Sequence, residues 1–389
     1  MSTIPSGTKF IGLAANYITK EKRSALINAE SEAYTMQDII DTVPGGLEGT
    51  QYVFVMANGT DVENAAELQA AYTTAQTMSA GSSNRITVIA APANYNFSSN
   101  FVMGAEFVDL VSLDGNRSIV FNGTATIQIT ANDVFVKGVD VLSKTFLIGN
   151  ALSSLRLENC NGGDNSFGGS LNASGTFTNC SGGQYSFGGI GTASGVFTDC
   201  VANGPYSFGG SGTASGTFTN CISNSFGAFG NTGTASGIFI NCISGSLSFG
   251  GGLNPASGTF TDCVSGDYSF GRQSPTTGVF TNCKGGIQSF GYQANASGVF
   301  TDCVGGDNSF GWSADGVFIR CISGINSFGL YDANGKLTDC VGGSGSFGSL
   351  SALTGKLYYC RLTSGTFNTV SGGGRTVLCI DGNNNQNNQ

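Results

Sequence analysis

Apolar and polar positions repeat with a period of 18 to 21 residues over the C-terminal two thirds of the chain. Each repeat holds one cysteine in a similar sequence context. A coil of this length is too small to bury its own apolar face, and such a period is typical of a solenoid whose coils are stable only when stacked. The repeated cysteines are Cys160, Cys180, Cys200, Cys221, Cys242, Cys263, Cys283, Cys303, Cys321, Cys340, Cys360 and Cys379.

Two further apolar positions recur in each repeat. Position −3, counted from the cysteine, holds Phe177, Phe197, Phe218, Phe239, Phe260, Phe280, Phe300 and Phe318, and then Leu337 and Leu357. Position +7 or +8 holds a second aromatic residue in a Ser-Phe-Gly triplet or a near copy: Phe167, Phe187, Phe208, Phe229, Phe249, Phe270, Phe290, Phe310, Phe328, Phe347 and Phe367. Position −5 is glycine from Gly175 to Gly355.

The residue before the cysteine predicts a corner. Phenylalanine at −3 and cysteine at 0 have opposite parity, so one continuous strand would send them to opposite faces. A bend in left-handed backbone conformation at −1 would turn both inward, and Asn and Asp tolerate that conformation best among non-glycine residues. Stacked coils would then carry an Asn/Asp ladder, which includes Asn179, Asn220 and Asn282.

These positions predict three short strands per coil. The second phenylalanine is expected on a third strand followed by a turn, and the glycine at −5 marks the corner before the next coil. Length differences between repeats fall outside the constant positions, which places them in loops. The fold class is therefore predicted as all-β, a right-handed single-stranded parallel β-helix with about 20 residues per coil, preceded by a small N-terminal α/β region.

The first 150 residues predict a cap and irregular early coils. A short helix is expected at 35–41 and a strand at 51–56. Thr60 and Glu63 form a capping box for a helix over 61–79, which would cover the open first coil. Strand-like runs follow at 86–90, 107–113, 118–121, 126–130, 134–136 and 144–148. We divide the rest into regular repeats over 151–382 and a polar tail, 383–389, either disordered or a strand closing the final coil.

Charge and apolar content exclude two classes of partner, nucleic acids and the membrane interior. The net charge is −9, and the only local basic cluster is Lys20, Lys22 and Arg23, so we expect no nucleic-acid partner. No run approaches the ~20 apolar residues of a membrane helix, and the first residues lack the apolar core of a signal peptide, so neither membrane insertion nor export by a cleaved signal is expected.

The cysteines are interpreted as small apolar side chains that fill a narrow interior. Adjacent coils would bring their Cα atoms into the range of about 4.4 to 6.8 Å seen in disulfides, but parallel side chains do not supply the ~90° torsion without strain. A straight line of thiols cannot enclose a tetrahedral ion, so no metal site and no cofactor are expected. We predict free thiols, protected while the chain is folded.

Catalytic chemistry is restricted because histidine is absent. The alternative, a glycosidase or lyase, needs paired carboxylates. The candidates are Asp164, Asp267 and Asp307 at +4, and the corner residues Asp199, Asp262, Asp302 and Asp339. Asp267 and Asp307 would lie two coils apart, about 9 to 10 Å, near the upper end of the range for inverting glycosidases. An aspartate in a turn needs no other explanation, so we assign no catalytic residue.

Outward residues beside the −3 phenylalanine form a row that could contact a partner. Threonine pairs such as Thr176 with Thr178 could bind ice or sugar, but Val196, and Ile238 with Ile240, interrupt the row. Packing against another subunit explains such a β-favouring surface better.

The N-terminal sequence resembles the opening of virion structural proteins of tailed bacteriophages, of the tail-fibre or appendage type. The similar residues are 2–10 and 34–40, and the stretch from 52–55 through 84–89 resembles the entry into their pectate-lyase-like β-helices. The resemblance implies that residues 1–50 dock on the particle, through other virion proteins, and that the protein is made in the host cytoplasm and incorporated into the virion.

We therefore expect a non-enzymatic phage structural protein, a β-helical fibre or appendage subunit that forms a homo-oligomer, plausibly a trimer, and contacts a host surface glycan. Two alternatives stay open: a glycan-cleaving tailspike-like depolymerase, and an adhesive solenoid that binds glycan or ice.

Overall fold

The computed structural model describes residues 51–142, 145–149, 152–223, 225–348, 350, 353–367, 370 and 373–388. The expected helix at 35–41, the basic cluster at 20–23 and the docking segment 1–50 lie outside these ranges. The described chain divides into two compact units. Unit 1 comprises 51–168 with 174–182, and unit 2 comprises 169–173 with 183–388.

Unit 1 is built of parallel strands arranged in three sheets. Its main sheet has the order β1 (Gln51–Val55), β2 (Ile86–Ala90), β5 (Val108–Ser112), β8 (Phe135–Lys137), β11 (Arg156–Glu158) and β12 (Thr176–Thr178). The second side holds β3 (Ala93–Tyr95), β6 (Ile119–Phe121), β9 (Val139–Asp140) and, in the last coil, β13 (Ser181–Gly182). The third holds β4 (Phe101–Met103), β7 (Ile127–Ile129) and β10 (Leu147–Ile148). The strand-like runs predicted between 86 and 148 are confirmed as coils of a solenoid.

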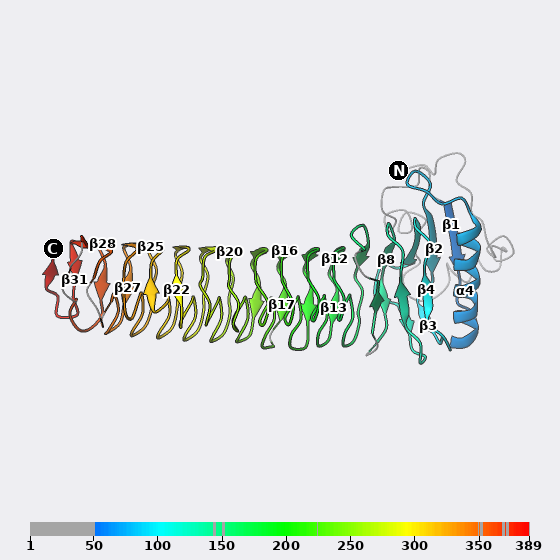
Figure 1. Ribbon diagram of the computed structural model, residues 1–389. Helices are drawn as coiled ribbons and strands as arrows, with labels where there is room; N and C mark the ends of the chain where they lie inside the picture. Colours follow the sequence, from blue (N-terminus) through cyan, green and yellow to red (C-terminus); the bar gives the residue numbers. More distant parts are fainter. Residues whose placement is uncertain are drawn as a thin grey trace. The chain divides into compact units, whose positions relative to one another are not determined.

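Helix α4 (Asp61–Thr77) lies beside β1 at the start of unit 1 (Figure 1). The predicted capping box is present: the Thr60 hydroxyl accepts from the Glu63 N–H, and the Glu63 carboxylate accepts from the Thr60 N–H. Its inward side chains are buried, including Leu68 and Tyr72, and the Tyr72 ring meets Phe101 edge-on at 5.2 Å. The helix therefore covers apolar side chains that the first coil would otherwise expose.

Unit 2 is a stack of parallel coils of about 20 residues (Figure 1). Its main sheet runs, in order, β14 (Val196–Thr198), β16 (Thr217–Thr219), β18 (Ile238–Ile240), β20 (Thr259–Thr261), β21 (Val279–Thr281), β23 (Val299–Thr301), β25 (Val317–Ile319), β26 (Lys336–Thr338), β28 (Lys356–Tyr358) and β30 (Arg375–Val377). Equivalent residues pair from coil to coil, as in Phe218 with Phe239. The predicted all-β parallel solenoid is confirmed.

A second side of unit 2 follows each cysteine. It holds β15 (Val201–Ala202), β17 (Ile222–Ser223) and β19 (Ile243–Ser244), and later β27 (Val341–Gly342), β29 (Arg361–Leu362) and β31 (Cys379–Ile380). The polar tail adds β32 (Gln386–Asn387), which pairs antiparallel with β31. Of the two predictions for the tail, the closing strand is confirmed.

The predicted corner at −1 is confirmed in both units. Asn179 has φ 50° and Asn220 has φ 54°, in the left-handed region. In each unit the bend turns the flanking side chains inward, and the phenylalanines at −3 and all twelve cysteines are at most 1% exposed.

The prediction that the second phenylalanine lies on a third strand is wrong. Ten of these eleven residues lie in turns or bends with positive φ, from 50° in Phe208 to 62° in Phe347. The third side is instead paired at position −7, through single bridges such as Ala214 with Ala235 and through β22 (Asn295–Ala296) with β24 (Ser313–Ala314). Burial of an aromatic ring alone does not require a strand, because a turn can also direct the ring inward.

The Ser-Phe-Gly turn is stabilised by hydrogen bonds between coils. The buried Ser269 hydroxyl accepts from the Ser248 N–H at 3.3 Å, and the Phe270 N–H donates to the Ser248 carbonyl at 3.1 Å. Equivalent pairs join Ser309 to Ser289 and Ser327 to Ser309. The small hydroxyl thus satisfies a buried N–H that would otherwise lack a partner.

The interior holds two columns of stacked rings. Within unit 2, the −3 rings from Phe197 to Phe318 stack at 4.7 to 4.9 Å, with interplanar angles of at most 5°. The second column stacks similarly, and the two meet edge to face, as Phe229 and Phe239 do at 89°. Offset stacking and edge-to-face contact are the favoured geometries of aromatic pairs.

Candidate functional site

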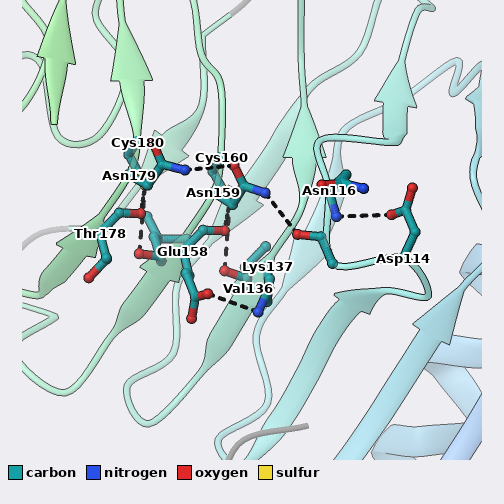
Figure 2. A network of polar contacts seen from close by, with 12 residues as sticks. Asp114, Asn116, Val136, Lys137, Glu158, Asn159, Cys160, Thr178, Asn179 and Cys180 are labelled. Atoms are coloured by element: carbon teal, nitrogen blue, oxygen red, sulfur yellow. Dashed lines mark hydrogen bonds and ion pairs between the residues drawn. The ribbon is translucent and has the colours of Figure 1, made fainter. Parts of the chain in front are cut away.

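The Asn/Asp ladder of unit 1 runs along the outside of its corners (Figure 2). The Asn159 side chain donates to the Gly115 carbonyl at 2.8 Å, and the Asn179 side chain donates to Asn159 Oδ1 at 3.1 Å. Lys137 forms an ion pair with Glu158 at 2.8 Å on the adjacent strands. These contacts join neighbouring coils, which indicates a structural role.

The ladder of unit 2 has the same character. Amide groups donate to the corner residue of the preceding coil: Asn220 to Asp199 at 2.9 Å, Asn241 to Asn220 at 2.9 Å, and Asn282 to Asp262 at 2.7 Å. Arg320 replaces the amide in one coil and donates two hydrogen bonds to Asp302, both at 2.7 Å. The Arg320 guanidinium holds the pKa of the Asp302 carboxyl below its ordinary value.

The cysteines are buried free thiols. Cys221 Sγ lies 3.5 Å from the carbonyl oxygen of Phe197 in the preceding coil and 3.5 Å from that of Thr219. Burial raises the pKa of the Cys160 and Cys221 thiols well above the ordinary value. A protonated, enclosed thiol is a poor nucleophile. Within the described ranges, no group of three His, Cys, Asp or Glu side chains is arranged to hold a metal ion.

The candidate carboxylates at +4 contact backbone. Asp267 Oδ1 accepts from the Ile287 N–H at 2.9 Å, and Asp307 Oδ1 accepts from the Ile325 N–H at 2.9 Å. Asp164 presents its backbone carbonyl to the Thr145 hydroxyl at 2.9 Å. Asp267 and Asp307 each stabilise the loop of the next coil, and this explains aspartate at +4 without catalysis.

A buried ion pair in unit 1 escaped the sequence analysis. Asp109 is 1% exposed and bonds to Arg85 at 2.5 and 2.8 Å, and it also accepts from the Phe135 N–H at 2.8 Å. Burial raises the pKa of the Asp109 carboxyl, although its hydrogen bonds to Arg85 oppose that shift. Its partners link β2, β5 and β8, so the pair joins successive coils. No periodic pattern marks it, because it belongs to the irregular early coils.

The main sheet of unit 2 presents an exposed β-branched face. We use this name for positions −4 and −2 of β14 to β25, where side chains alternate with the buried phenylalanine. Val196 is 45% exposed, Ile238 47%, Ile240 39% and Val279 45%. Threonines occupy most of the remaining positions. The face predicted from the sequence is therefore present and uncovered within this unit.

Three aromatic side chains that the sequence analysis did not select also lie together in unit 2. Tyr292, Trp312 and Tyr331 belong to successive coils, and we call them the aromatic ridge. The Trp312 ring lies 6.3 Å from that of Tyr292 and 5.4 Å from that of Tyr331. The signal was available: in four earlier coils glycine follows the Phe-Gly pair, as at Gly189 and Gly210, whereas aromatic residues, Tyr292 and Trp312, hold that position here.

None of the helices in the described ranges combines the length and the apolar character needed to cross a bilayer. Comparisons of the chain with protein-family models, with curated proteins and with solved structures returned no match.

Proposed function

We propose that the chain is a non-enzymatic structural protein of a bacteriophage particle, a β-helical fibre or appendage subunit for assembly or host-surface attachment. The N-terminal resemblance supports the phage assignment, with residues 1–50 as the segment that docks on other virion proteins. The observation that carries the structural role is the exposed β-branched face of unit 2, a flat apolar and hydroxyl surface on a regular stack of coils.

The same face supports a homo-oligomer, and the oligomer that we propose is a trimer. Aliphatic side chains such as Ile238 and Ile240 stand in register with Thr217, Thr219, Thr259 and Thr261 on neighbouring strands. Contiguous exposed apolar surface marks interaction sites, and β-branched side chains lose little entropy when they pack. A second copy of this chain, which offers the same surface, is the partner that we propose.

Composition of the particle tests the assignment. Purified virions should contain the chain, detected by mass spectrometry, and antibody against residues 183–388 should label a projecting fibre or appendage in electron micrographs. Absence of the chain from infectious particles would contradict the proposal.

Sedimentation tests the oligomer. The full chain should sediment as an oligomer, and the double variant Ile238→Lys/Ile240→Lys should sediment as a monomer because charge opposes burial of the face. Leu253→Lys is the matched control, since Leu253 is 71% exposed outside the sheet and should leave the oligomer unchanged. A wild-type monomer at micromolar concentration would exclude this partner.

The glycan-cleaving alternative has its own test. Asp267→Asn and Asp307→Asn keep a carbonyl oxygen for the Ile287 and Ile325 N–H groups, so the double variant should fold. If the wild-type chain degrades a polysaccharide and this variant does not, the alternative replaces our proposal. We expect no degradation by either protein.

A further inference from the structure

The aromatic ridge is a departure from the repeat. In several earlier coils the equivalent residue is glycine, and a Cβ on Gly210 would lie 2.4 Å from the Gly227 carbonyl oxygen, whereas Asn231 and Arg272 hold the position in two others. The Tyr292 coil keeps the four-residue connection of earlier coils, such as 210–213 between Gly209 and Ala214, and the Trp312 coil shortens it. Four residues, 292–295, join Gly291 to Ala296, but only two, 312–313, join Gly311 to Ala314. Stacking of the coils does not require these large rings.

The ridge is accessible. Trp312 is 37% exposed and Tyr331 44% exposed, and their rings meet edge to face at 69°. The Trp312 backbone is held on both sides, because its N–H donates to the Ala294 carbonyl and its carbonyl accepts from the Tyr331 N–H, both at 2.9 Å. The rings therefore project from a fixed backbone.

A row of polar side chains runs beside the ridge. Asn295, Ser313 and Asp332 occupy equivalent positions in successive coils. The exposed Asp315 carboxylate accepts from the Asn295 amide at 2.8 Å, the Ser313 hydroxyl at 2.5 Å and the Asn334 amide at 3.0 Å. Trp312 and Tyr331 thus directly precede members of the polar row in the chain, and the row is in register from coil to coil.

We propose that the ridge and this polar row bind a neutral oligosaccharide, a proposal that rests on host-surface attachment as the function. Sugar rings present apolar C–H faces that pack on aromatic rings, and their hydroxyls donate to carboxylate and amide oxygens. Coils stack at about 4.8 Å, close to the length of one sugar residue, so the ridge accommodates two to three residues along the stack.

Charge restricts the ligand to neutral chains. Asp315 and Asp332 lie beside the rings, and the chain as a whole carries −9, so an anionic polysaccharide would be repelled. Arg272 follows the Phe-Gly pair in the coil before that of Tyr292. Its guanidinium lies 4.5 Å from the centre of the Tyr268 ring, so this cation already packs on an aromatic side chain of its own coil.

Fluorescence tests the site directly because Trp312 is the only tryptophan in the chain. The full chain is titrated with maltohexaose, cellohexaose and chitohexaose, with polygalacturonate as the anionic comparison. We expect a saturable change in emission with at least one neutral hexasaccharide and none with polygalacturonate. Tyr331→Ala should weaken that binding at least 10-fold while keeping the reporter.

Tyr206→Ala is the matched control. Tyr206 stacks on Tyr185 at 5.4 Å in other coils of unit 2, so its loss should leave the affinity unchanged. No response to any neutral hexasaccharide overturns the proposal, as does equal affinity in the Tyr331→Ala variant. Particle composition separates this outcome from failure of the proposed function: virions that contain the chain without glycan binding contradict only the ridge, and glycan binding by a chain absent from virions contradicts only the virion role.

Discussion

At the residue scale, the coil depends on side chains that accept unusual backbone conformations. The corner at −1 is left-handed in every described repeat, and Asn or Asp fills it in most coils. Arg320, Tyr359 and Leu378 also occupy it, with φ of 53°, 56° and 50°. Stacking of the coils therefore imposes the left-handed corner whatever residue occupies it, and Asn and Asp lower the free-energy cost of that backbone conformation.

Substitution at one corner tests this conformation. Asn220→Val should destabilise the chain by about 1 to 2 kcal/mol relative to Asn220→Gly, because a β-branched residue is strained at φ 54° whereas glycine is not. Both variants lose the hydrogen bond to Asp199, so that loss cancels in the comparison. The measurement is guanidinium unfolding followed by circular dichroism, and equal midpoints for the two variants would contradict a left-handed corner.

Glycine at −5 is required by close approach between coils. A Cβ on Gly237 would lie 2.2 Å from the Gly216 carbonyl oxygen, a backbone atom of the preceding coil that cannot move aside as a side chain could. Gly237→Ala should cost about 3 kcal/mol or more, measured by thermal unfolding. Gly81→Ala is the control: its Cβ would meet nothing within 4 Å, so its midpoint should change little. Similar shifts in the unfolding midpoint for the two substitutions would contradict the close approach of adjacent coils at position −5.

At the element scale, the sequence predicted some parts of the coil better than others. The strand before each cysteine was predicted correctly. Residues three apart in one strand, such as Phe218 and Cys221, point to opposite faces, so the burial of both requires a bend between them. The second phenylalanine was misplaced because burial does not distinguish a strand from a turn. Its triplet contains the cue: the serine hydroxyl bonds a neighbouring coil, and the following glycine, such as Gly209 with φ 68°, suits a turn.

The buried thiols of Cys160 and Cys221 give the protein a predictable response to alkali. Burial raises the pKa of Cys160 and Cys221, so the folded chain keeps protons that the unfolded chain releases above about pH 8.5. The free energy of unfolding should therefore fall as pH rises from 8.5, by about 1.4 kcal/mol per pH unit for each such thiol. Below pH 8.5 this contribution is fully present.

Denaturant unfolding between pH 7 and 9.5 measures this slope. Cys221→Ala removes one thiol and should make the slope shallower by about 1.4 kcal/mol per pH unit. A stability that is flat across this range, or that rises with pH, would be inconsistent with protonated buried thiols.

At the scale of the whole molecule, each coil contacts mainly its neighbours. A single coil cannot offset the entropy of ordering about 20 residues, at roughly 1 to 2 kcal/mol each, with two rings and one thiol. Stability therefore arises from stacking, and repeats of this kind behave as a series of units coupled to their neighbours.

Deletion of one coil tests this modularity within unit 2. Removing 243–263 joins Cys242 to Val264, and Ile243 and Val264 occupy equivalent, paired positions. The shortened chain should fold with an unchanged circular dichroism spectrum per residue. Removing 243–253 takes out half a coil, breaks the register of every later coil and should abolish cooperative unfolding. Comparable folding of the two deletions would contradict a stack of equivalent units.

The candidate site was less predictable than the fold. Constant positions of the repeat predict the ladder at Asn179, Asn220 and Asn282, and the structure places hydrogen bonds between coils at these residues. The aromatic ridge lies at positions whose residue type varies between repeats, so a pattern defined by the constant positions does not include it. Tyr331 stands one position later in its loop than Trp312 does, after Leu330, yet the two rings lie together, and loop paths do not follow from periodicity.

The most direct test of the whole account is titration of the thiols with a disulfide reagent before and after denaturation. All twelve cysteines are buried, at most 1% exposed, and none forms a disulfide. We expect no prompt reaction in the native protein and twelve reactive thiols in guanidinium. Prompt reaction of native thiols, or fewer than twelve after unfolding, would contradict an interior column of free cysteines and the coil built around it.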